Sequence, residues 1–503
     1  MQTRREQVRA YRFVTRRIVS ALLSGEPETT DLPMRRLGLA LFSSILFAAI
    51  VLAGVGAYGL IVPGGGTPKP NTLIVERETG ARYVYQQDRL FPVLNYASAR
   101  LILGVANPEV RLMSQRSLRS LPRGRPVGIS GAPDALPDSS ALLGLPWSVC
   151  SAPRSPDVPA PVTHLLVGSQ PSGGVAIGGD NALLVAVDAD RYLIWHNLRL
   201  KVRDRGVLAA LGYSSAFAIP VGPALINAIT AGPELAPFQL RDAGKPSTRR
   251  IKGQTPLIGQ VYHVGHQHYV LTADGLVTIG EVSTLLFLAG GVTDQEITAV
   301  EAGRNQVDRR AEAEGFPSTV PRLRAVNNVQ SAVCAHYRGG TDAAHRTITV
   351  EVFDRVPGKL SVSTSDLVGQ VTGGVRTADR VAVDGGHGAL VQALPAAGAT
   401  AAGATVYLVT DQGIKYALAT RSDAKTALGY GEVTPLEVPS ALLALIPTGP
   451  TLDPVAARSF TGRPNPAPTS GSPRPSSPSP SPGSSRPPSV PPSVSAKPSS
   501  SLG

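Results

Sequence analysis

The sequence predicts an α+β membrane protein in which one transmembrane helix carries an elongated extracytoplasmic body. Three observations lead to this prediction: a long uncharged apolar segment near the N-terminus, a recurring strand-and-helix pattern after it, and a single pair of cysteines. We expect the body to hold about four small α/β repeat units around a central β-rich core. Gly and Pro number 52 and 45 among 503 residues, and this composition favours many turns and short elements.

The apolar segment runs from Gly38 to Val62 without one charged side chain. About 20 apolar residues are enough to cross the hydrocarbon core of a bilayer, and a core helix is rarely apolar on every face over this length. Arginines are frequent before the segment, whereas Lys69 is the only basic residue between it and Arg77. This asymmetry predicts an uncleaved signal anchor with a cytoplasmic N-terminus and with the chain after about Pro63 outside.

Residues 4–23 are expected to form an amphipathic helix in front of the membrane segment. Such a helix suits an anionic membrane surface or a partner protein; the alternative is a topology signal with incidental amphipathicity. Glu26-Pro27 is expected to end the helix. The N-terminal part thus divides into a cytoplasmic arm, residues 1–37, and a transmembrane helix, residues 38–62. The basic face consists of Arg5, Arg9, Arg12 and Arg16, and the apolar face of Val8, Tyr11, Val14, Ile18 and Leu22.

The body, residues 63–462, contains related segments. Leu211–Pro237 and Leu428–Pro454 both begin with Leu-Gly-Tyr and both end with Gly-Pro-x-Leu-x-Pro when aligned without a gap. The runs that start at Arg82 and Tyr269 show the same order of strand, turn, strand and helix. Their irregular spacing argues against a tight solenoid, so we expect separate small units.

Two further patterns place strands in the body. Asp274-Gly275 and Gln412-Gly413 suit the tips of β-hairpins, because glycine supplies the backbone conformation that such turns need. Residues 347–353, TITVEVF, alternate between apolar and other side chains, which predicts a strand of a central sheet.

Cys150 and Cys334 are the only cysteines. In an oxidising extracytoplasmic space, two cysteines of one large domain are expected to pair, and the alternative is two free buried thiols. A bond between them would close a long loop, for which chain entropy sets an upper contribution of roughly 5 kcal/mol.

The sequence contains no G-x-x-x-x-G-K-[ST] loop for a nucleotide and no G-x-S-x-G nucleophile elbow. His263, His266 and His268 form the one cluster of metal-ligating side chains, with His266 and His268 expected on one strand face. The segment offers no evident acidic or cysteine partner, so ordinary hydrogen bonding is favoured over a metal site. We therefore predict no catalytic, cofactor or metal residues, and only the two cysteines as site residues.

The net charge of +12 is not gathered into one basic stretch with interleaved aromatics, which argues against a nucleic-acid binder. From about Arg463 to residue 503 the chain is mostly Pro and Ser, and such a segment cannot bury a core. We expect residues 463–503 to be disordered, either as a spacer through a cell wall or as a solvated terminus without a role.

Several motifs occur in a fixed order along residues 1–458. They are Tyr11-Arg12-Phe13, Tyr83-Val84-Tyr85, Pro92-Val93-Leu94-Asn95, Gly128-Ile129-Ser130-Gly131-Ala132-Pro133, Trp147-Ser148-Val149-Cys150, Tyr407-Leu408-Val409-Thr410-Asp411-Gln412-Gly413 and Val438-Pro439-Ser440-Ala441-Leu442-Leu443. These motifs and their order resemble those of the EccB family, whose members are core membrane components of the actinobacterial type VII (ESX) secretion system.

The resemblance implies a structural subunit that anchors and organises the export machinery, with a disulfide matching Cys150–Cys334. It implies a homodimer or higher oligomer and the partners EccC, an FtsK-like ATPase, EccD, EccE and the mycosin protease. ATPase activity is attached to the family name, so ATP is a cofactor by that attribution only. An extracytoplasmic ATPase and a cell-wall-binding module, the latter suggested by the repeats and the tail, are the alternative functions.

Overall fold

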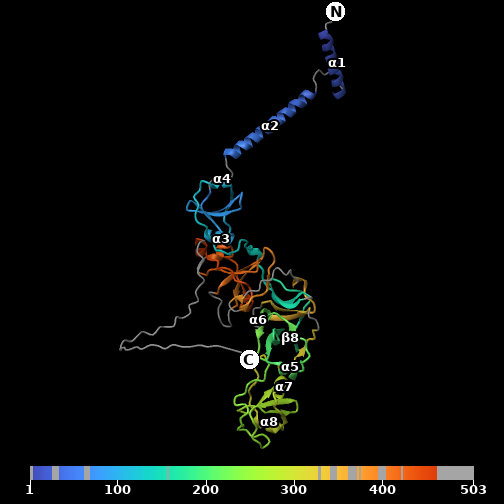
Figure 1. Cartoon of the computed structure of the whole chain (residues 1–503), viewed down its shortest axis with the longest axis vertical. Coiled ribbons are helices and arrows are strands. Elements are labelled where there is room, and N and C mark those ends of the chain that lie inside the picture. The colour runs from blue at the N-terminus through green and yellow to red at the C-terminus, as the bar shows by residue number, and fades with distance from the viewer. Residues whose placement is uncertain are drawn as a thin grey trace, which may run out of the picture. The chain divides into compact units, whose positions relative to one another are not determined.

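The computed structural model describes residues 4–24, 33–61, 68–155, 158–326, 330–339, 348–360, 371–372, 375–394, 404–420 and 423–460. The Pro/Ser-rich tail and the helix end at Glu26-Pro27 lie outside these residues and stay predictions. The described chain forms two N-terminal helices, four repeat units of one topology, a central six-stranded sheet and a two-stranded ribbon (Figure 1).

The two N-terminal helices are α1 (Arg4–Ser24) and α2 (Pro33–Ile61), and both agree with the sequence prediction. The segment Leu37–Tyr58 of α2 is long and apolar enough to cross a membrane, with a mean hydropathy of 2.4 and no part buried. The hydroxyls of Ser43 and Ser44 donate to the carbonyls of Ala40 and Leu41, each at 2.9 Å. These bonds satisfy the two serine hydroxyls from within the helix, as a bilayer interior requires.

Each repeat unit follows the same path. Three antiparallel strands form a meander, a helix follows, and a fourth strand returns parallel to the first. A second helix then leads to a short segment that lies parallel to the third strand. Every unit therefore closes both edges of its meander with chain from its own C-terminal half, which limits unpaired sheet edges.

In sequence, unit 1 precedes the first three strands of the central sheet, and unit 2 follows them. Unit 1 consists of β1 (Thr72–Glu76), β2 (Arg82–Gln86), β3 (Arg89–Pro92), α3 (Tyr96–Leu103), β4 (Val110–Met113) and α4 (Gln115–Leu118). Unit 2 consists of β8 (Asn181–Val187), β9 (Asp190–Trp195), β10 (Leu198–Val202), α5 (Arg205–Ala210), β11 (Ile219–Pro220), α6 (Pro223–Ala228) and β12 (Thr230–Ala231), and β17 (Arg322–Leu323) also pairs with β8.

The other two units repeat this order. Unit 3 consists of β13 (Val261–Val264), β14 (Gln267–Leu271), β15 (Leu276–Ile279), α7 (Glu281–Ala289), β16 (Asp294–Glu296) and α8 (Ala299–Asn305). Unit 4 consists of β23 (Gly388–Ala393), β24 (Val406–Thr410), β25 (Lys415–Ala417), α9 (Ala424–Ala427), β26 (Leu436–Val438) and α10 (Ser440–Ala444), followed by α11 (Pro454–Ala457).

The four repeats predicted from sequence are confirmed, but each is larger than the pattern indicated. The runs that start at Arg82 and Tyr269 both begin in the second strand of a unit, β2 and β14. These runs therefore miss the first strand, the returning strand and the second helix of their units, whereas the aligned segments Leu211–Pro237 and Leu428–Pro454 contain the returning strand and second helix of units 2 and 4. The returning strands are as short as two residues in β11, which is too short for a periodic signal.

The predicted hairpin tips are also confirmed. Asp274-Gly275 lies between β14 and β15, and Gln412-Gly413 lies between β24 and β25. Gly275 has a φ of +148° and Gly413 a φ of +69°, values that residues with a Cβ atom rarely adopt.

The central sheet has the strand order β22-β6-β5-β18-β19-β7. The predicted strand at 347–353 is β19, so the expectation of a central sheet is confirmed. Its apolar face shares one hydrophobic core with units 2 and 4, to which α6 and α10 both contribute. The strands are β5 (Trp147–Ser155), β6 (Val158–Leu166), β7 (Val175–Ala176), β18 (Ala332–Tyr337), β19 (Ile348–Phe353) and β22 (Arg380–Ala382).

Units 1 and 4 are distant in sequence but share a second core and two helix caps. Arg100 of α3 donates to the carbonyl of Leu428 at the end of α9, at 3.0 Å. Arg458, just after α11, donates to the carbonyl of Ile102 near the end of α3, also at 3.0 Å. The last carbonyls of a helix lack partners and carry partial negative charge, so guanidinium groups stabilise both ends.

The remaining short elements connect these parts. They are η1 (Ser139–Ala141), η2 (Gly358–Leu360) and the ribbon of β20 (Val371–Thr372) and β21 (Val375–Arg376).

Candidate functional site

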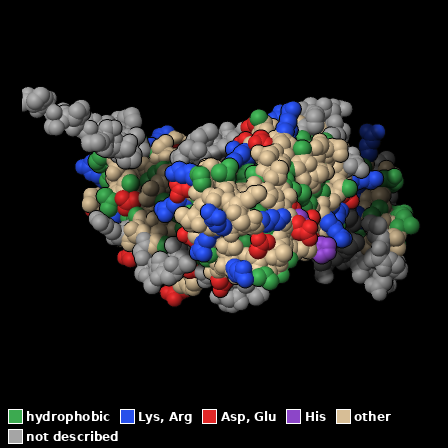
Figure 2. Space-filling view, turned by 90° about the horizontal axis from the view of Figure 1, so that it is seen from below, with side chains coloured by type: hydrophobic (Ala, Val, Ile, Leu, Met, Phe, Trp, Pro, Cys, Tyr) green, Lys and Arg blue, Asp and Glu red, His purple; other side chains and the backbone are tan. Residues whose placement is uncertain are grey.

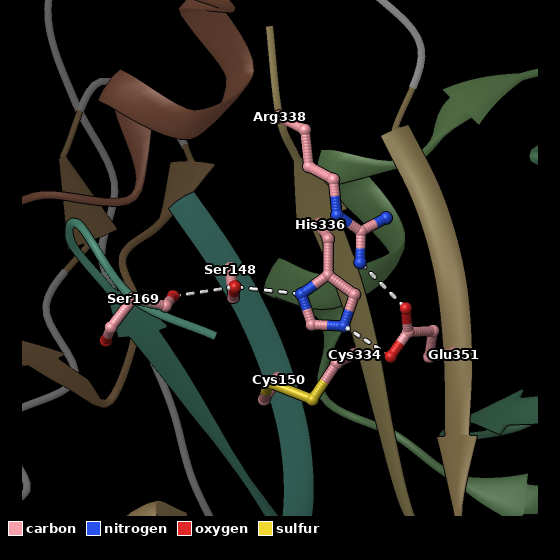
Figure 3. The surroundings of a disulfide bond; sticks show 7 residues. All are labelled: Ser148, Cys150, Ser169, Cys334, His336, Arg338 and Glu351. Carbon is pink, nitrogen blue, oxygen red and sulfur yellow. Dashed lines mark hydrogen bonds and ion pairs between the residues drawn. A yellow bond between two sulfur atoms is a disulfide. The ribbon is translucent and has the colours of Figure 1, made fainter. Parts of the chain in front are cut away.

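The two cysteines form a disulfide at the middle of the central sheet (Figure 3). Cys150 of β5 and Cys334 of β18 are direct partners in the antiparallel register, with their Cα atoms 4.0 Å apart. Both are fully buried, and 184 positions separate them in sequence. The closed loop contains units 2 and 3, whereas unit 1 precedes it and unit 4 follows it.

Side chains alternate between the two faces of a strand, so the disulfide shares its face with every second residue of β5 and β18. Ser148 lies two residues before Cys150 and His336 two residues after Cys334, and the antiparallel register places them opposite each other. The Oγ atom of Ser148 and Nδ1 of His336 are 2.8 Å apart. This polar pair is fully buried beside the disulfide.

Two charged side chains, Glu351 and Arg338, extend the pair of Ser148 and His336 into a row of four polar residues (Figure 3). The Nε2 atom of His336 lies 3.3 Å from Oε2 of Glu351 on β19, and Arg338 donates to the other carboxylate oxygen at 2.8 Å. Burial lowers the pKa of His336 most strongly, while the Glu351 carboxylate raises it and Arg338 lowers it further. The row joins β5, β18 and β19 through side chains as well as through backbone hydrogen bonds.

A serine, a histidine and a carboxylate in one row also occur in hydrolases, so the row could indicate a nucleophile. Two features argue against this. Ser148 donates its hydroxyl hydrogen to the carbonyl of Ser169 at 2.9 Å, so that hydrogen is directed away from His336. Ser148 and His336 also have no exposed surface, and a substrate could not reach the hydroxyl. The row is suited to fixing strand register.

His164 lies on the other side of the disulfide. It is the partner of Cys150 in the pairing of β5 with β6, and it is almost fully buried. Burial, with a smaller contribution from the positive charge of Arg380, lowers the pKa of His164 to about 4. The histidine is therefore neutral in the folded protein at neutral pH, and protonating it requires unfolding or acid.

Sequence reasoning found the cysteines but missed Ser148, His164, His336 and Glu351. A usable signal was present for two of them. If two cysteines are direct partners of antiparallel strands, the residues two before one and two after the other must also be partners on the same face. That rule would have paired Ser148 with His336.

The histidine cluster is arranged differently from the sequence prediction. His266 lies in the turn between β13 and β14 and is exposed, so it does not share a strand face with His268. Instead His263 and His268 are direct partners across this hairpin. The expected lack of an acidic partner is also wrong, because Asp294 of β16 lies beside both rings. Asp294 follows α7, too far along the chain for a local sequence pattern to reveal it.

The arm helix α1 exposes its apolar face. Tyr11 is 75% exposed and Leu22 is 80% exposed, and Val8, Val14 and Ile18 are each at least half exposed. The arginines of the opposite face give the helix a strong positive charge. An exposed apolar stripe beside a basic face is the arrangement expected of a helix that docks on an anionic surface or a partner.

The surface of the body shows no single basic patch on the face seen in Figure 2, where basic and acidic side chains are interspersed.

Comparison with known proteins decides the family. The family profile described as "Type VII secretion system ESX-1, transport TM domain B" matches residues 1–462. The chain belongs to the EccB family. One relative of this EccB chain is "ESX-3 secretion system ATPase EccB3" of Mycolicibacterium smegmatis, 29% identical over 466 residues and covering 89% of each chain. Another is "ESX-5 secretion system ATPase EccB5" of Mycobacterium marinum, 30% identical over 484 residues and covering 89% of this chain and 91% of the relative.

Solved EccB-type structures have the same fold. A chain of an intact ESX-5 inner membrane complex matches with a TM-score of 0.59 and 26% identity, covering 92% of this chain and 96% of that one. The EccB3 dimer from the ESX-3 core complex matches with a TM-score of 0.58 and 27% identity, covering 77% of this chain and all of that one. The family resemblance and the mixed α/β fold predicted from sequence are both confirmed.

Replacing both cysteines with serine should destabilise the body by up to about 5 kcal/mol, because the unfolded chain regains the entropy of the open loop. Urea unfolding of the full chain in detergent measures the effect, followed by tryptophan fluorescence, to which buried Trp147 on β5 and Trp195 on β9 contribute. Reductant should lower the wild-type midpoint to that of C150S/C334S and leave the variant unchanged. An equal midpoint for both proteins without reductant would contradict a stabilising bond.

Acid should destabilise the protein through His164. Its pKa is about 4 when folded against 6.5 for the free side chain, so the unfolded state takes up the proton first as pH falls. Stability is thus lost between pH 6.5 and about 4, by roughly 3 kcal/mol from this residue alone. Unfolding midpoints at pH 7 and pH 4.5 should differ less in His164→Gln than in wild type. His266→Gln, in the exposed turn, is the matched control; the same acid loss in both variants would refute the assignment.

Proposed function

We propose that this EccB-family chain anchors and organises a type VII secretion membrane complex as one of its structural subunits. The observation that carries the proposal is the match of 92% of the chain to a chain of an intact ESX-5 inner membrane complex. The site chemistry supports it, because the buried polar row and the disulfide join strands and offer no accessible nucleophile.

In this proposal α2 crosses the cytoplasmic membrane, α1 lies on the cytoplasmic side and the repeat body lies outside. The excess of arginine before the membrane segment supports this orientation. The disulfide supports it independently, because such bonds persist in oxidising compartments. The exposed apolar face of α1 then serves to dock a partner or the inner leaflet.

The assembly we propose is a dimer or higher oligomer that contacts EccC, EccD, EccE and the mycosin protease. Support for self-association comes from the related EccB3, which was solved as a dimer. The four repeat units and the central sheet provide a large body outside the membrane, and a scaffold of several interfaces needs such a body.

A second function, ATP hydrolysis, is favoured by one observation, the word ATPase in the names of the relatives. The sequence lacks the glycine-rich loop with lysine that cradles nucleotide phosphates. We therefore place ATP hydrolysis below the structural role.

The structural role predicts that the full chain, extracted in mild detergent, co-purifies with other secretion subunits and runs as a dimer or larger particle. Val14→Ser with Leu22→Ser should reduce the co-purified subunits several-fold, because it removes apolar surface from α1. Arg9→Lys keeps the charge of the helix and should behave as wild type. Purification of the chain as a monomer without any other secretion subunit would contradict the proposal.

The ATPase alternative is checked by phosphate release from ATP and Mg²⁺ with the purified full chain. We expect no turnover above a heat-inactivated sample, since no phosphate-binding loop is present in the sequence. Turnover that follows the protein through successive purification steps would instead support the enzyme.

A further inference from the structure

Unit 3 brings two imidazoles and one carboxylate together on three adjacent strands. His263 lies on β13, His268 on its neighbour β14, and Asp294 on its other neighbour β16. The antiparallel register pairs His263 with His268 directly. Each residue offers one ligand atom, and these atoms all lie within 4.8 Å of one another.

Two of the separations, each from one imidazole to an oxygen of Asp294, are close to those in the coordination shell of a small divalent ion. The Nδ1 atom of His263 is 2.9 Å from Oδ1 of Asp294, and Nε2 of His268 is 3.5 Å from Oδ2 of the same carboxylate. Tetrahedral Zn²⁺ with bonds of about 2.0–2.1 Å holds neighbouring ligand atoms about 3.3 Å apart. The two separations lie on either side of that value.

Two of the ligand atoms have no partner besides each other. Nδ1 of His263 and Oδ1 of Asp294 are both shielded from solvent, and neither has a hydrogen-bond partner among the described residues. Nδ1 of His263 and Oδ1 of Asp294 contact only each other, as an ion pair, and a cation bound between them would be a partner for both. The three side chains are 23–28% exposed, which leaves a route for an ion from solvent.

We propose that His263, His268 and Asp294 bind one divalent transition-metal ion, with Zn²⁺ the best match. Imidazole and carboxylate ligands suit this ion, and three protein ligands leave a fourth position open. The bound ion ties the hairpin of β13 and β14 to β16. Both cysteines lie in the central sheet, so unit 3 has no covalent link of its own and would gain this one.

The test uses the full chain in detergent, first stripped with EDTA and then dialysed against Zn²⁺. Elemental analysis should give one Zn²⁺ per wild-type chain, and Co²⁺ as a spectroscopic probe should develop the visible absorption of a tetrahedral site. His263→Ala, His268→Ala and Asp294→Asn should each weaken binding by about tenfold or more. His266→Ala, in the adjacent turn, should bind as wild type.

A second measurement separates ligand loss from misfolding. Zn²⁺ should slow amide hydrogen exchange in β14 and β16 of the wild-type chain, and it should have no such effect in His268→Ala. Exchange in the central sheet should be alike in all variants and report that they fold. Equal Zn²⁺ content in His266→Ala and His268→Ala would mean adventitious binding and would overturn the proposal, as would a wild-type chain that retains no Zn²⁺.

Discussion

The pairing of β5 with β18 is the constraint on which the body depends. It brings together residues on either side of units 2 and 3, and the disulfide between Cys150 and Cys334 makes the pairing covalent. One face of the paired strands supplies the core shared with units 2 and 4. The other face carries the row from Ser148 to Glu351, in which His336 contacts both Ser148 and Glu351 only in this register. The apolar face thus provides stability and the polar face provides specificity.

The repeat units solve a related problem on a smaller scale. A three-stranded meander alone has two open edges, and each unit covers both with its own returning segments. Units 1 and 4 are then joined by Arg100 and Arg458, each of which caps a helix of the other part of the chain. Contacts of this kind suit a subunit whose function is to hold a shape and present surfaces to its neighbours.

The sequence was informative where one short stretch carries the signal. The membrane helix, the hairpin at Gly275, the strand at 347–353 and the disulfide partners all depend on composition or on local spacing. It was uninformative where strands distant in sequence decide the geometry. Asp294 lies on a three-residue strand after α7, and no periodic pattern connects it to the hairpin of His263 and His268. The same limit hid His164 and Glu351, which only sheet pairing brings to the disulfide.

The position of the disulfide also determines how the chain bears mechanical load. A pull between the membrane helix and the C-terminal tail follows the shortest covalent path, which crosses from Cys150 to Cys334. Units 2 and 3 lie within the closed loop and outside that path, so tension along the chain cannot unravel them while the bond is intact. Units 1 and 4 lie on the path and carry the load. The bond therefore divides the body into a tensioned part and a shielded part.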